Sequence, residues 1–467
     1  MLIQVIDLIW EVDEQAYPEE IARLRRENEE LRAEIARLRK LLEEALRSSK
    51  RQAAPFSRRH PKAHPQKPGR KAGKEYGRSC RRERPQLIDQ VIDVPLPRHC
   101  PHCAGDLEET GVVSQYQSEI PEPRVEHAEF RIHLGRCRHC GRRVQGRDRR
   151  QTSRAVGSAS SQVGTRALAL AILLNKGLGL PYGKTVAVLQ QGWGLQVSRS
   201  GICQAIARAG HKAEPTYEYL QERIRGEPSV TADETGWKVA AQLQWMWVFS
   251  SEQITVYSIQ PGRGFEQASS VLGEDFAGFL VRDGWSVYRQ FQQAWHQTCV
   301  AHLLRRCREM IQVQAGSAAQ FPRQLQSILQ AALSVRQRYQ QGQISSHGLA
   351  VARGKIEAVM DRLLAKPRRS PANQRLSKHM RRERDALFTF LYCPGLEATN
   401  WRAEQAIRPM VVTRKVWGGN QTAAGAQVQS ILLSILTTCR QQNQPFLPLL
   451  QQLLCSPQPK ILNLLSR

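Results

Sequence analysis

The stretch from residue 229 to 301 places the strongest limit on the fold, because its apolar side chains follow the spacing of β-strands. Short runs rich in aromatic and β-branched residues, which favour strands, are separated by polar turns. One run of helical spacing interrupts them. The pattern predicts a mixed five-stranded sheet with helices. The predicted elements, in chain order, are strands at residues 229–233, 244–249 and 254–259, a helix at 265–272, and strands at 278–283 and 297–301.

Two of these strands end on an aspartate, Asp233 on the first and Asp283 on the fourth. A single aspartate at a strand end is usually a turn former. Two of them in a basic protein favour a site for hard cations, which need several carboxylates to hold them. Two divalent cations about 4 Å apart can hold the attacking and leaving oxygens of a phosphodiester. A third carboxylate is expected from a later helix: Glu404 is the candidate, and Glu397 and Glu234 are its competitors.

The charge of the chain indicates a polyanionic partner. The formal net charge of the 467 residues is +26, and much of the excess is concentrated in a few segments. Each Lys or Arg that contacts a phosphate releases condensed counterions, so such a protein is expected to bind nucleic acid. A hydrophobic fraction of 41% is enough for real cores, and the length predicts two or three folded units.

No segment predicts export or a membrane span. The apolar start, residues 1–10, contains Asp7 and lacks a basic head and a cleavage site. The apolar run at residues 167–174 is too short to cross a bilayer. Eleven cysteines without an export signal fit reduced thiols, some of them metal ligands. We therefore expect a cytoplasmic, nucleoid-associated bacterial protein without a membrane partner, although a nuclear protein satisfies the same facts.

Heptad spacing in residues 1–46 predicts a coiled-coil helix. Between residues 19 and 46 the chain has no Pro or Gly. β-branched residues at one heptad position and Leu at the other favour a parallel two-stranded coil, whose register Asn28 would fix. A single amphipathic helix packed on its own protein is the alternative. The heptad positions are Ile21, Asn28, Ile35 and Leu42 on one side and Leu24, Leu31, Leu38 and Ala45 on the other.

Residues 47–95 are predicted to form a basic flexible linker that includes a short strand at residues 87–94. Pro and Gly forbid a continuous helix in most of this segment, and its charge forbids a core. The linker either lies on phosphates or is a solvated tether.

Residues 96–146 are predicted to form a structural zinc ribbon. Two Cys-x-x-Cys knuckles flank a strand-like stretch at residues 130–134, and four thiolates suit tetrahedral zinc. His102 and His139 lie inside the knuckles and are alternative ligands. Four protein ligands leave no open position for chemistry. The predicted zinc ligands are Cys100, Cys103, Cys137 and Cys140.

Residues 155–224 are predicted to be helical and to resemble a helix-turn-helix. Helices at residues 184–191 and 198–209 are separated by a glycine-bearing turn, and Ser198 is a suitable N-cap. Any helical hairpin shows the same pattern, so a DNA-reading role and a packing role both fit.

The rest of the chain is predicted to contain three further regions. They are a catalytic core in two parts, residues 225–310 and 396–441, a helical insertion at 311–395, and a C-terminal tail at 442–467.

The order of strands and acids resembles the ribonuclease-H-like fold of the retroviral integrase and transposase superfamily. Over nearly the whole chain, the sequence is also similar to transposases of the insertion-sequence-sixty-six family. The family's third acid lies in an Ala-Glu-Arg-Ala-x-Arg-Pro pattern, which places it on Glu404. The matching motifs are the leading coiled coil, the cysteine knuckles, Asp233-Glu-Thr-Gly-Trp237, Asp283-Gly-Trp285, Cys299-Val-Ala-His302 with Arg305-Arg306, Ala403-Glu404-Gln-Ala-Ile-Arg408-Pro409, and Arg414-Lys415-Val-Trp417 with a glycine pair.

The resemblance implies a bacterial DNA transposase whose catalytic acids Asp233, Asp283 and Glu404 bind Mg²⁺ or Mn²⁺. Such an enzyme hydrolyses the DNA at the 3′ ends of a mobile element and joins the freed 3′ hydroxyls to target DNA. The resemblance also implies a homo-oligomer assembled on DNA and accessory transposition proteins. A non-catalytic, zinc-containing DNA-binding regulator and a ribonuclease-H-like nuclease without strand transfer are the alternatives.

The chain departs from the family pattern beside the third acid. Thr399-Asn400-Trp401 stands where the family usually has Asp-Asn-Asn, and Gln405 stands where it usually has Arg. These changes leave the three acids in place and affect positions that are expected to contact DNA.

Several other residues near the motifs have predicted roles. His302 either orients a water or phosphate at the site or caps the helix that begins there. Trp237 and Trp285 either stack on an unpaired base or pack in the core. Five basic residues are predicted to neutralise DNA phosphates: Arg305, Arg306, Arg408, Arg414 and Lys415.

Overall fold

In the computed structural model, the chain divides into two compact units, Met1–Ser118 and Glu119–Arg467. The residues that the structure describes are 22–35, 37–38, 84–157, 161–314 and 316–465.

The first unit contains the expected N-terminal helix. Residues 22–35 and 37–38 are helical, and the heptad leucines Leu24, Leu31 and Leu38 are 47–56% exposed. An exposed apolar stripe is compatible with a coiled coil, whose pairing stays a prediction. The heptad residues Ile21, Leu42 and Ala45 and most of the basic linker lie outside the described residues.

The strand expected at residues 87–94 is not formed. These residues are exposed and have no regular secondary structure. A strand is stable only when its backbone groups pair with a neighbour, and the described part of the first unit contains no other strand.

The second unit begins with a hairpin around the second cysteine knuckle. β1 (Leu134–Arg136) and β2 (Arg143–Gln145) pair antiparallel. Cys137 N–H donates to Arg142 O at 2.9 Å, which closes the turn between them. Of the strand predicted at residues 130–134, only residue 134 belongs to β1, because pairing with β2 begins there.

Four helical segments lead into the sheet: α2 (Thr165–Ile172), the π-helical turn η2 (Leu173–Gly177), α3 (Tyr182–Trp193) and α4 (Arg199–Arg225). Ser198 caps α4 by accepting a hydrogen bond from Gly201 N–H at 3.0 Å. α4 continues beyond its predicted end at residue 209, because its buried stripe extends to Ile224. Helix α13 (Phe446–Cys455), in the predicted tail, packs on α2 and α4.

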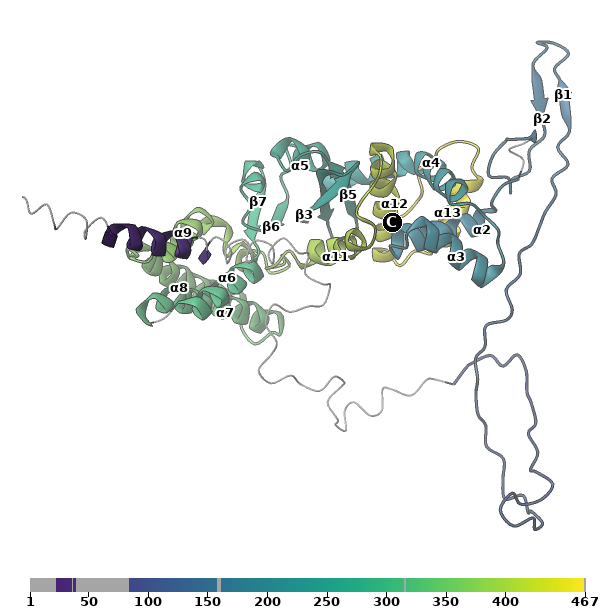
Figure 1. Cartoon of the computed structure of the whole chain (residues 1–467), viewed down its shortest axis with the longest axis horizontal. Coiled ribbons are helices and arrows are strands. Elements are labelled where there is room, and N and C mark those ends of the chain that lie inside the picture. Colours follow the sequence, from purple (N-terminus) through teal and green to yellow (C-terminus); the bar gives the residue numbers. More distant parts are fainter. Residues whose placement is uncertain (1–21, 36, 39–83, 158–160, 315, 466–467) are drawn as a thin grey trace, which may run out of the picture. The chain divides into compact units, whose positions relative to one another are not determined.

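The centre of the second unit is a mixed five-stranded sheet, as predicted. The strand order is β5-β4-β3-β6-β7 (Figure 1), with β3, β4 and β5 antiparallel and with β6 and β7 parallel to β3. Helix α5 (Phe265–Leu272), at the predicted residues, lies between β5 and β6 in the chain. The strands are β3 (Ser229–Val239), β4 (Gln242–Ser250), β5 (Thr255–Gln260), β6 (Phe279–Arg282) and β7 (Trp295–Thr298).

β3 is longer than predicted and passes through Asp233 instead of ending there. Residues 234–239 stay paired with β4 across a tight turn at residues 240–241, both of which have positive φ. The sequence did not reveal this extension, because Glu234, Gly236 and Lys238 weaken the strand pattern there and pairing with β4 fixes the conformation of these residues. Parallel pairing with β6 stops at Thr231 and Val281, so Asp233 still lies beyond the last paired residues.

Helices cover both faces of the sheet. One face, which carries Ala232, packs on α4 and α5 in the largest apolar core. The other face, which carries Trp237, packs on α11 (Trp401–Trp417) in a smaller core. Because successive strand residues point to opposite faces, Asp233 lies on the α11 face and Glu234 on the α4 face.

Side chains close both edges of the sheet. At one edge, α12 (Ala423–Gln441) lies along β5. At the other edge, the Gln297 side chain of β7 accepts from Phe390 N–H at 3.0 Å and donates to Leu387 O at 3.2 Å. Three α12 hydroxyls accept hydrogen bonds from backbone N–H groups of β5: Ser434 from Tyr257 at 2.9 Å, Ser430 from Ile259 at 3.2 Å, and Thr438 from Thr255 at 3.2 Å.

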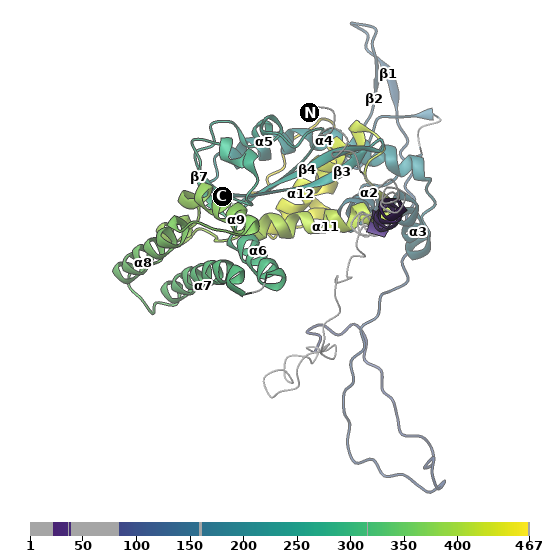
Figure 2. The same ribbon diagram turned by 60° about the vertical axis from the view of Figure 1, so that its left-hand side comes forward.

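The expected helical insertion forms a bundle with its own apolar core beside β7 (Figures 1 and 2). The first helix of the bundle starts directly after β7, earlier than the predicted boundary at residue 311. The helices are α6 (Val300–Val313), α7 (Gln320–Gln340), α8 (Ser346–Ala365), α9 (Pro371–Arg382) and α10 (Thr389–Tyr392). Among the helices that the structure describes, none is both long enough and apolar enough to cross a membrane.

Candidate active site

Asp233 lies on β3, two residues beyond its last pairing with β6, and Asp283 directly follows the last residue of β6. The register pairs Thr231 with Val281, and continuing it along both strands leads to the aspartates. Each carboxylate is held by a backbone N–H. Asp233 Oδ1 accepts a hydrogen bond from Glu234 N–H at 2.9 Å, and Asp283 Oδ1 accepts one from Trp285 N–H at 2.8 Å. Both side chains therefore belong to the same end of the parallel pair.

Glu404 reaches this end of the sheet from the first turn of α11. Asn400, the N-cap residue, is fully buried, and its Nδ2 donates to Ala232 O on β3 at 3.4 Å. Val300 N–H donates to Ala398 O at 3.0 Å, which joins the start of α6 to the segment before α11. The N-termini of both helices are thus held near β3, where their partial positive charge favours a carboxylate such as Glu404.

The pKa of Asp233 shows that the other two acids lie near it. Burial raises the pKa of Asp233 to about 7, and repulsion from Glu234, Asp283 and Glu404 adds to the increase. A hydrogen bond from the N–H of Glu234 acts in the opposite direction. Negative charge is therefore gathered at a point where a cation would relieve the repulsion.

The two competing acids are engaged elsewhere. Glu234, on the opposite face of β3, accepts from Arg263 Nε at 2.8 Å and from the Tyr288 hydroxyl with its other oxygen. Glu397 is paired with Arg336 at 3.5 Å. Since both carboxylates already have partners, the geometry favours Glu404 as the third acid.

The two tryptophans near the aspartates contact the protein itself. Trp237 is fully buried, and its Nε1 donates to Asn420 Oδ1 at 2.7 Å, as expected for core packing. Trp285 stacks on the guanidinium of Arg263, which lies 3.9 Å from the ring centroid, and Trp245 lies 4.6 Å from the same group. Trp285 thereby orients the arginine that holds Glu234, on the face of the sheet away from α11.

A buried ion-pair network holds the backbone at Asp283. Arg282, the residue before it, donates to Asp283 O at 3.0 Å and to Thr298 Oγ1 at 3.1 Å, and forms an ion pair with Glu383. Glu383 is fully buried and also accepts from Arg289 at 2.6 Å and from Thr298 at 2.7 Å. Because Glu383 follows α9 directly, the network ties the helical insertion to the strand that carries Asp283.

A groove of about 630 Å³ opens beside Asp283, lined mainly by residues of α6 and of the loop after β6. The insertion and the sheet meet closely there, because a Cβ added to Gly284 would lie 2.5 Å from the His379 ring. Arg305 and Arg306 line the groove, and Arg305 is exposed. Two of the five cations predicted to contact DNA are thus beside the second aspartate.

The three predicted cations of α11 have different surroundings. Arg408 is exposed, and Lys415 is half-buried. Arg414 is half-buried, and its guanidinium donates to Thr235 Oγ1 at 3.1 Å and to Gly236 O. Arg408 is therefore exposed, whereas Arg414 braces α11 against β3. The predicted DNA contacts of both residues stay predictions.

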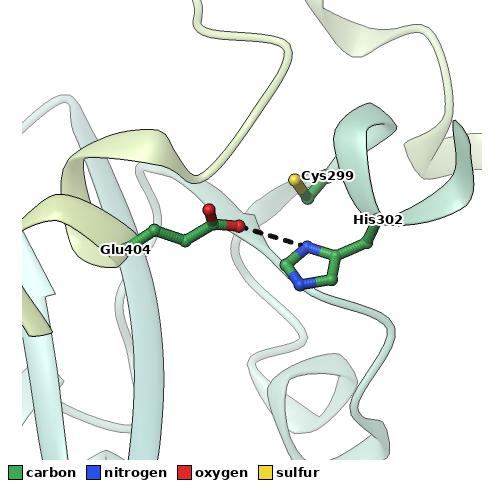
Figure 3. Close-up of side chains that lie close together, drawn as sticks. All are labelled: Cys299, His302 and Glu404. Carbon is green, nitrogen blue, oxygen red and sulfur yellow. Dashed lines mark ion pairs between the residues drawn. The ribbon is translucent and has the colours of Figure 1, made fainter. Parts of the chain in front are cut away.

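A cluster beside the acids was not predicted from the sequence. Figure 3 shows Cys299, His302 and Glu404 directed at one another from the starts of α6 and α11. His302 Nδ1 lies 3.4 Å from Glu404 Oε1. The N-cap of α6 is Cys299, so the capping role considered for His302 does not apply. The signal that would have revealed the cluster is the Cys-x-x-His spacing at a strand-to-helix junction.

The carboxylate of Glu404 is turned towards this cluster. Among the described residues, only Cys299, His302 and Glu404 form a group of three or more potential metal ligands whose atoms all lie within 4.8 Å of one another. Asp283 and Glu404 lie close enough to Asp233 to repel its carboxylate, but the ligand atoms of the three acids do not all lie within that distance of one another.

The four predicted zinc ligands form two knuckles, one in each unit. Hydrogen bonds from the backbone of His102 and Cys103 lower the pKa of the Cys100 thiol. The backbone of Cys140 and of His139 lowers the pKa of Cys137 in the same way. Thiolates are the form that binds zinc, so each knuckle is suited to the role. The shared four-cysteine site stays a prediction.

The family model described as "Transposase IS66 family" matches residues 160–428, which include the three acids and the helical insertion. The chain belongs to this family. The resemblance seen in the motifs is therefore confirmed. A protein of Sinorhizobium fredii (strain NBRC 101917 / NGR234), named "Uncharacterized protein y4qI", is 24% identical over 299 residues. The match covers 56% of this chain and 53% of that protein, so the chain spans about half the length of this relative.

Proposed function

We propose that the protein is a DNA transposase that cuts and joins DNA strands with Asp233, Asp283 and Glu404. The observation that supports this most is that Asp283 and Glu404 lie close enough to Asp233 to repel its carboxylate, beside a groove that carries Arg305 and Arg306. Membership of a transposase family supports the same class of activity. The net charge of +26 suits a DNA partner.

The three carboxylates are proposed to hold Mg²⁺ or Mn²⁺. Hard oxygen donors suit these ions. Within the part of the chain that the structure describes, Glu404 Oε1 is buried without a hydrogen-bond partner, so it has a lone pair to offer. When bound, the ions supply charge stabilisation for the attacking and leaving oxygens of a phosphodiester.

The proposed reaction has two steps at one site. In the first, the oxygen of a water molecule bonds to phosphorus and the bond from phosphorus to the 3′ oxygen breaks, which frees a 3′ hydroxyl on the element end. In the second, that hydroxyl oxygen attacks a target phosphodiester and displaces its 3′ oxygen. Arg305 and Arg306 hold the entering phosphates, and the Arg282–Glu383 pair keeps the Asp283 backbone in place.

The proposed fold of the core is ribonuclease-H-like. The strand order β5-β4-β3-β6-β7, with the acids at the carboxyl end of the β3–β6 pair, supports it. The zinc ribbon and the N-terminal coiled coil are proposed to add DNA contacts and to bring two chains together on two element ends.

Three substitutions test the catalytic assignment: Asp233→Asn, Asp283→Asn and Glu404→Gln. Each removes a ligand charge and almost no positive surface, so strand cleavage should fall by at least about 100-fold while DNA binding is kept. The matched control is Glu309→Gln, the same chemical change on another residue that lines the groove. The assay measures cleavage and joining of DNA that carries the element ends, with Mg²⁺. Normal cleavage by all three variants would overturn the proposal, and cleavage without any joined product would indicate a nuclease instead.

A further inference from the structure

We propose that Cys299, His302 and Glu404 form a binding site for one thiophilic divalent cation, with Zn²⁺ the best fit. Their ligand atoms are a sulfur, an imidazole nitrogen and a carboxylate oxygen, all within 4.8 Å of one another. They come from two helix starts that backbone hydrogen bonds hold together, so the cluster is built into the fold (Figure 3). This site is separate in its chemistry from the oxygen-only site of the three acids.

Unpartnered polar atoms point into the cluster. Among the described residues, neither His302 Nδ1 nor Glu404 Oε1 has a hydrogen-bond partner, although both atoms are buried and lie 3.4 Å apart. Buried polar atoms without partners are costly, and a cation between these two would satisfy both at once. Cys299 is fully buried, and its Sγ accepts a hydrogen bond from Asn400 N–H at 3.5 Å and contacts the backbone of Ala301 and His302.

The donor set decides which cation fits. Thiolate and imidazole favour Zn²⁺ over Mg²⁺, which prefers oxygen ligands. Zinc ligands lie about 2.0–2.3 Å from the ion, so small side-chain rotations would close the cluster on it. Three protein ligands leave a fourth position for water. On binding, the Cys299 S–H bond breaks, a sulfur–metal bond forms and the proton leaves to water.

The consequence for activity rests on the proposed function. Glu404 is shared, because the carboxylate that faces His302 is the one proposed to join Asp233 and Asp283. A cation bound to Cys299, His302 and Glu404 would hold the Glu404 carboxylate in this cluster. We therefore expect Zn²⁺ to inhibit Mg²⁺-dependent cleavage by removing the third acid.

Metal content of the full chain tests the site directly. The purified protein is loaded with Zn²⁺ and analysed for bound metal, and Co²⁺ loading reports sulfur ligation by its thiolate charge-transfer absorption. The Cys299→Ala variant should bind about one zinc ion fewer per chain than wild type, and its cobalt–thiolate absorption should be weaker. The matched control is Cys307→Ala, because Cys307 is a buried cysteine of the same helix outside the cluster. The predicted zinc ribbon contributes equally to all variants and cancels in the difference.

A second variant keeps the test decisive if Cys299→Ala does not fold. The His302 side chain is 35% exposed, so His302→Gln leaves no cavity, and it should weaken zinc binding at this site by at least about 100-fold. Equal zinc content in wild type, Cys299→Ala and His302→Gln would overturn the proposal. In the cleavage assay, both variants should resist zinc concentrations that inhibit wild type. A wild-type chain that cleaves no DNA contradicts the proposed function, whereas the metal content still decides the zinc site.

Discussion

We predict that Glu383→Gln lowers the free energy of unfolding of the catalytic unit more than a substitution on the surface does. The reason is that it leaves the buried positive charge of Arg282 without a compensating negative charge. Glu383 is 0% exposed and Arg282 is 1% exposed, and the glutamate is also paired with Arg289. Removing one partner of a buried ion pair typically costs about 3–5 kcal/mol. That cost corresponds to a factor of roughly 100 to several thousand in the folding equilibrium, since about 1.4 kcal/mol is tenfold.

The measurement is denaturant or thermal unfolding of the full chain, followed by fluorescence of the buried tryptophans. The control is Asp361→Asn, which removes a carboxylate that Arg384 contacts at 2.5 Å but that is 57% exposed. Exposed ion pairs contribute about 0–1 kcal/mol to stability, so Asp361→Asn should change the free energy of unfolding very little. The double variant Arg282→Met with Glu383→Leu should recover most of the loss, because apolar residues can replace a buried ion pair.

The same network predicts a dependence on pH. Burial acts to raise the pKa of Glu383, but Arg282, together with hydrogen bonds from Thr298, Arg282 and Arg289, outweighs it and lowers the pKa below its ordinary value of 4.5. A lowered pKa stabilises the fold above pH 4.5, and this stabilisation is lost as the pH falls through the pKa of the folded state. The difference between wild type and Glu383→Gln should therefore be full near pH 7 and shrink in acid. Equal unfolding midpoints at pH 7 would refute the reasoning.

Three further predictions concern parts of the chain outside this network. Elemental analysis of Cys137→Ser should show about one zinc fewer per chain, and an unchanged content would remove the zinc ribbon. Replacing Leu31 and Leu38 with Glu should reduce the mass of complexes measured by light scattering on DNA that carries element ends; identical masses would mean that the helix packs within its own chain. Arg408→Ala should weaken DNA binding in a gel-shift assay without changing stability. Arg414→Ala should lower the melting temperature, because Arg414 braces α11 on β3. If Arg408→Ala lowers the melting temperature and Arg414→Ala does not, the assignment is wrong.

The sequence predicted the sheet well, because the apolar pattern of strands is local. The helix at residues 265–272 was placed at its observed ends. β3 and α4 were predicted too short for the same physical reason: their extensions are stabilised by partners distant in sequence. Residues 234–239 are held by β4, and the distal half of α4 is held by α12 and α13.

The site was predictable where it followed strand ends and unpredictable where it depended on side-chain direction. Spacing placed Asp233 and Asp283 near each other, but only the alternation of a continuous β3 puts Glu234 on the other face. The contacts of the Arg414 guanidinium with β3 were not predictable either, because they depend on how α11 packs on the sheet. Likewise, only the meeting of two helix starts brings Cys299 and His302 to Glu404.

The closed edges of the sheet have a consequence for assembly. If several copies gather on one stretch of DNA, as proposed, tethering raises the local concentration of every exposed surface. Free strand edges under those conditions would invite uncontrolled sheet-to-sheet joining. The hydroxyls of α12 occupy outward N–H groups of β5, and Gln297 ties β7 to the insertion. Under the proposed function, copies gathered on DNA would associate through surfaces other than the edges of this sheet, where side chains can specify how many chains join and in what order.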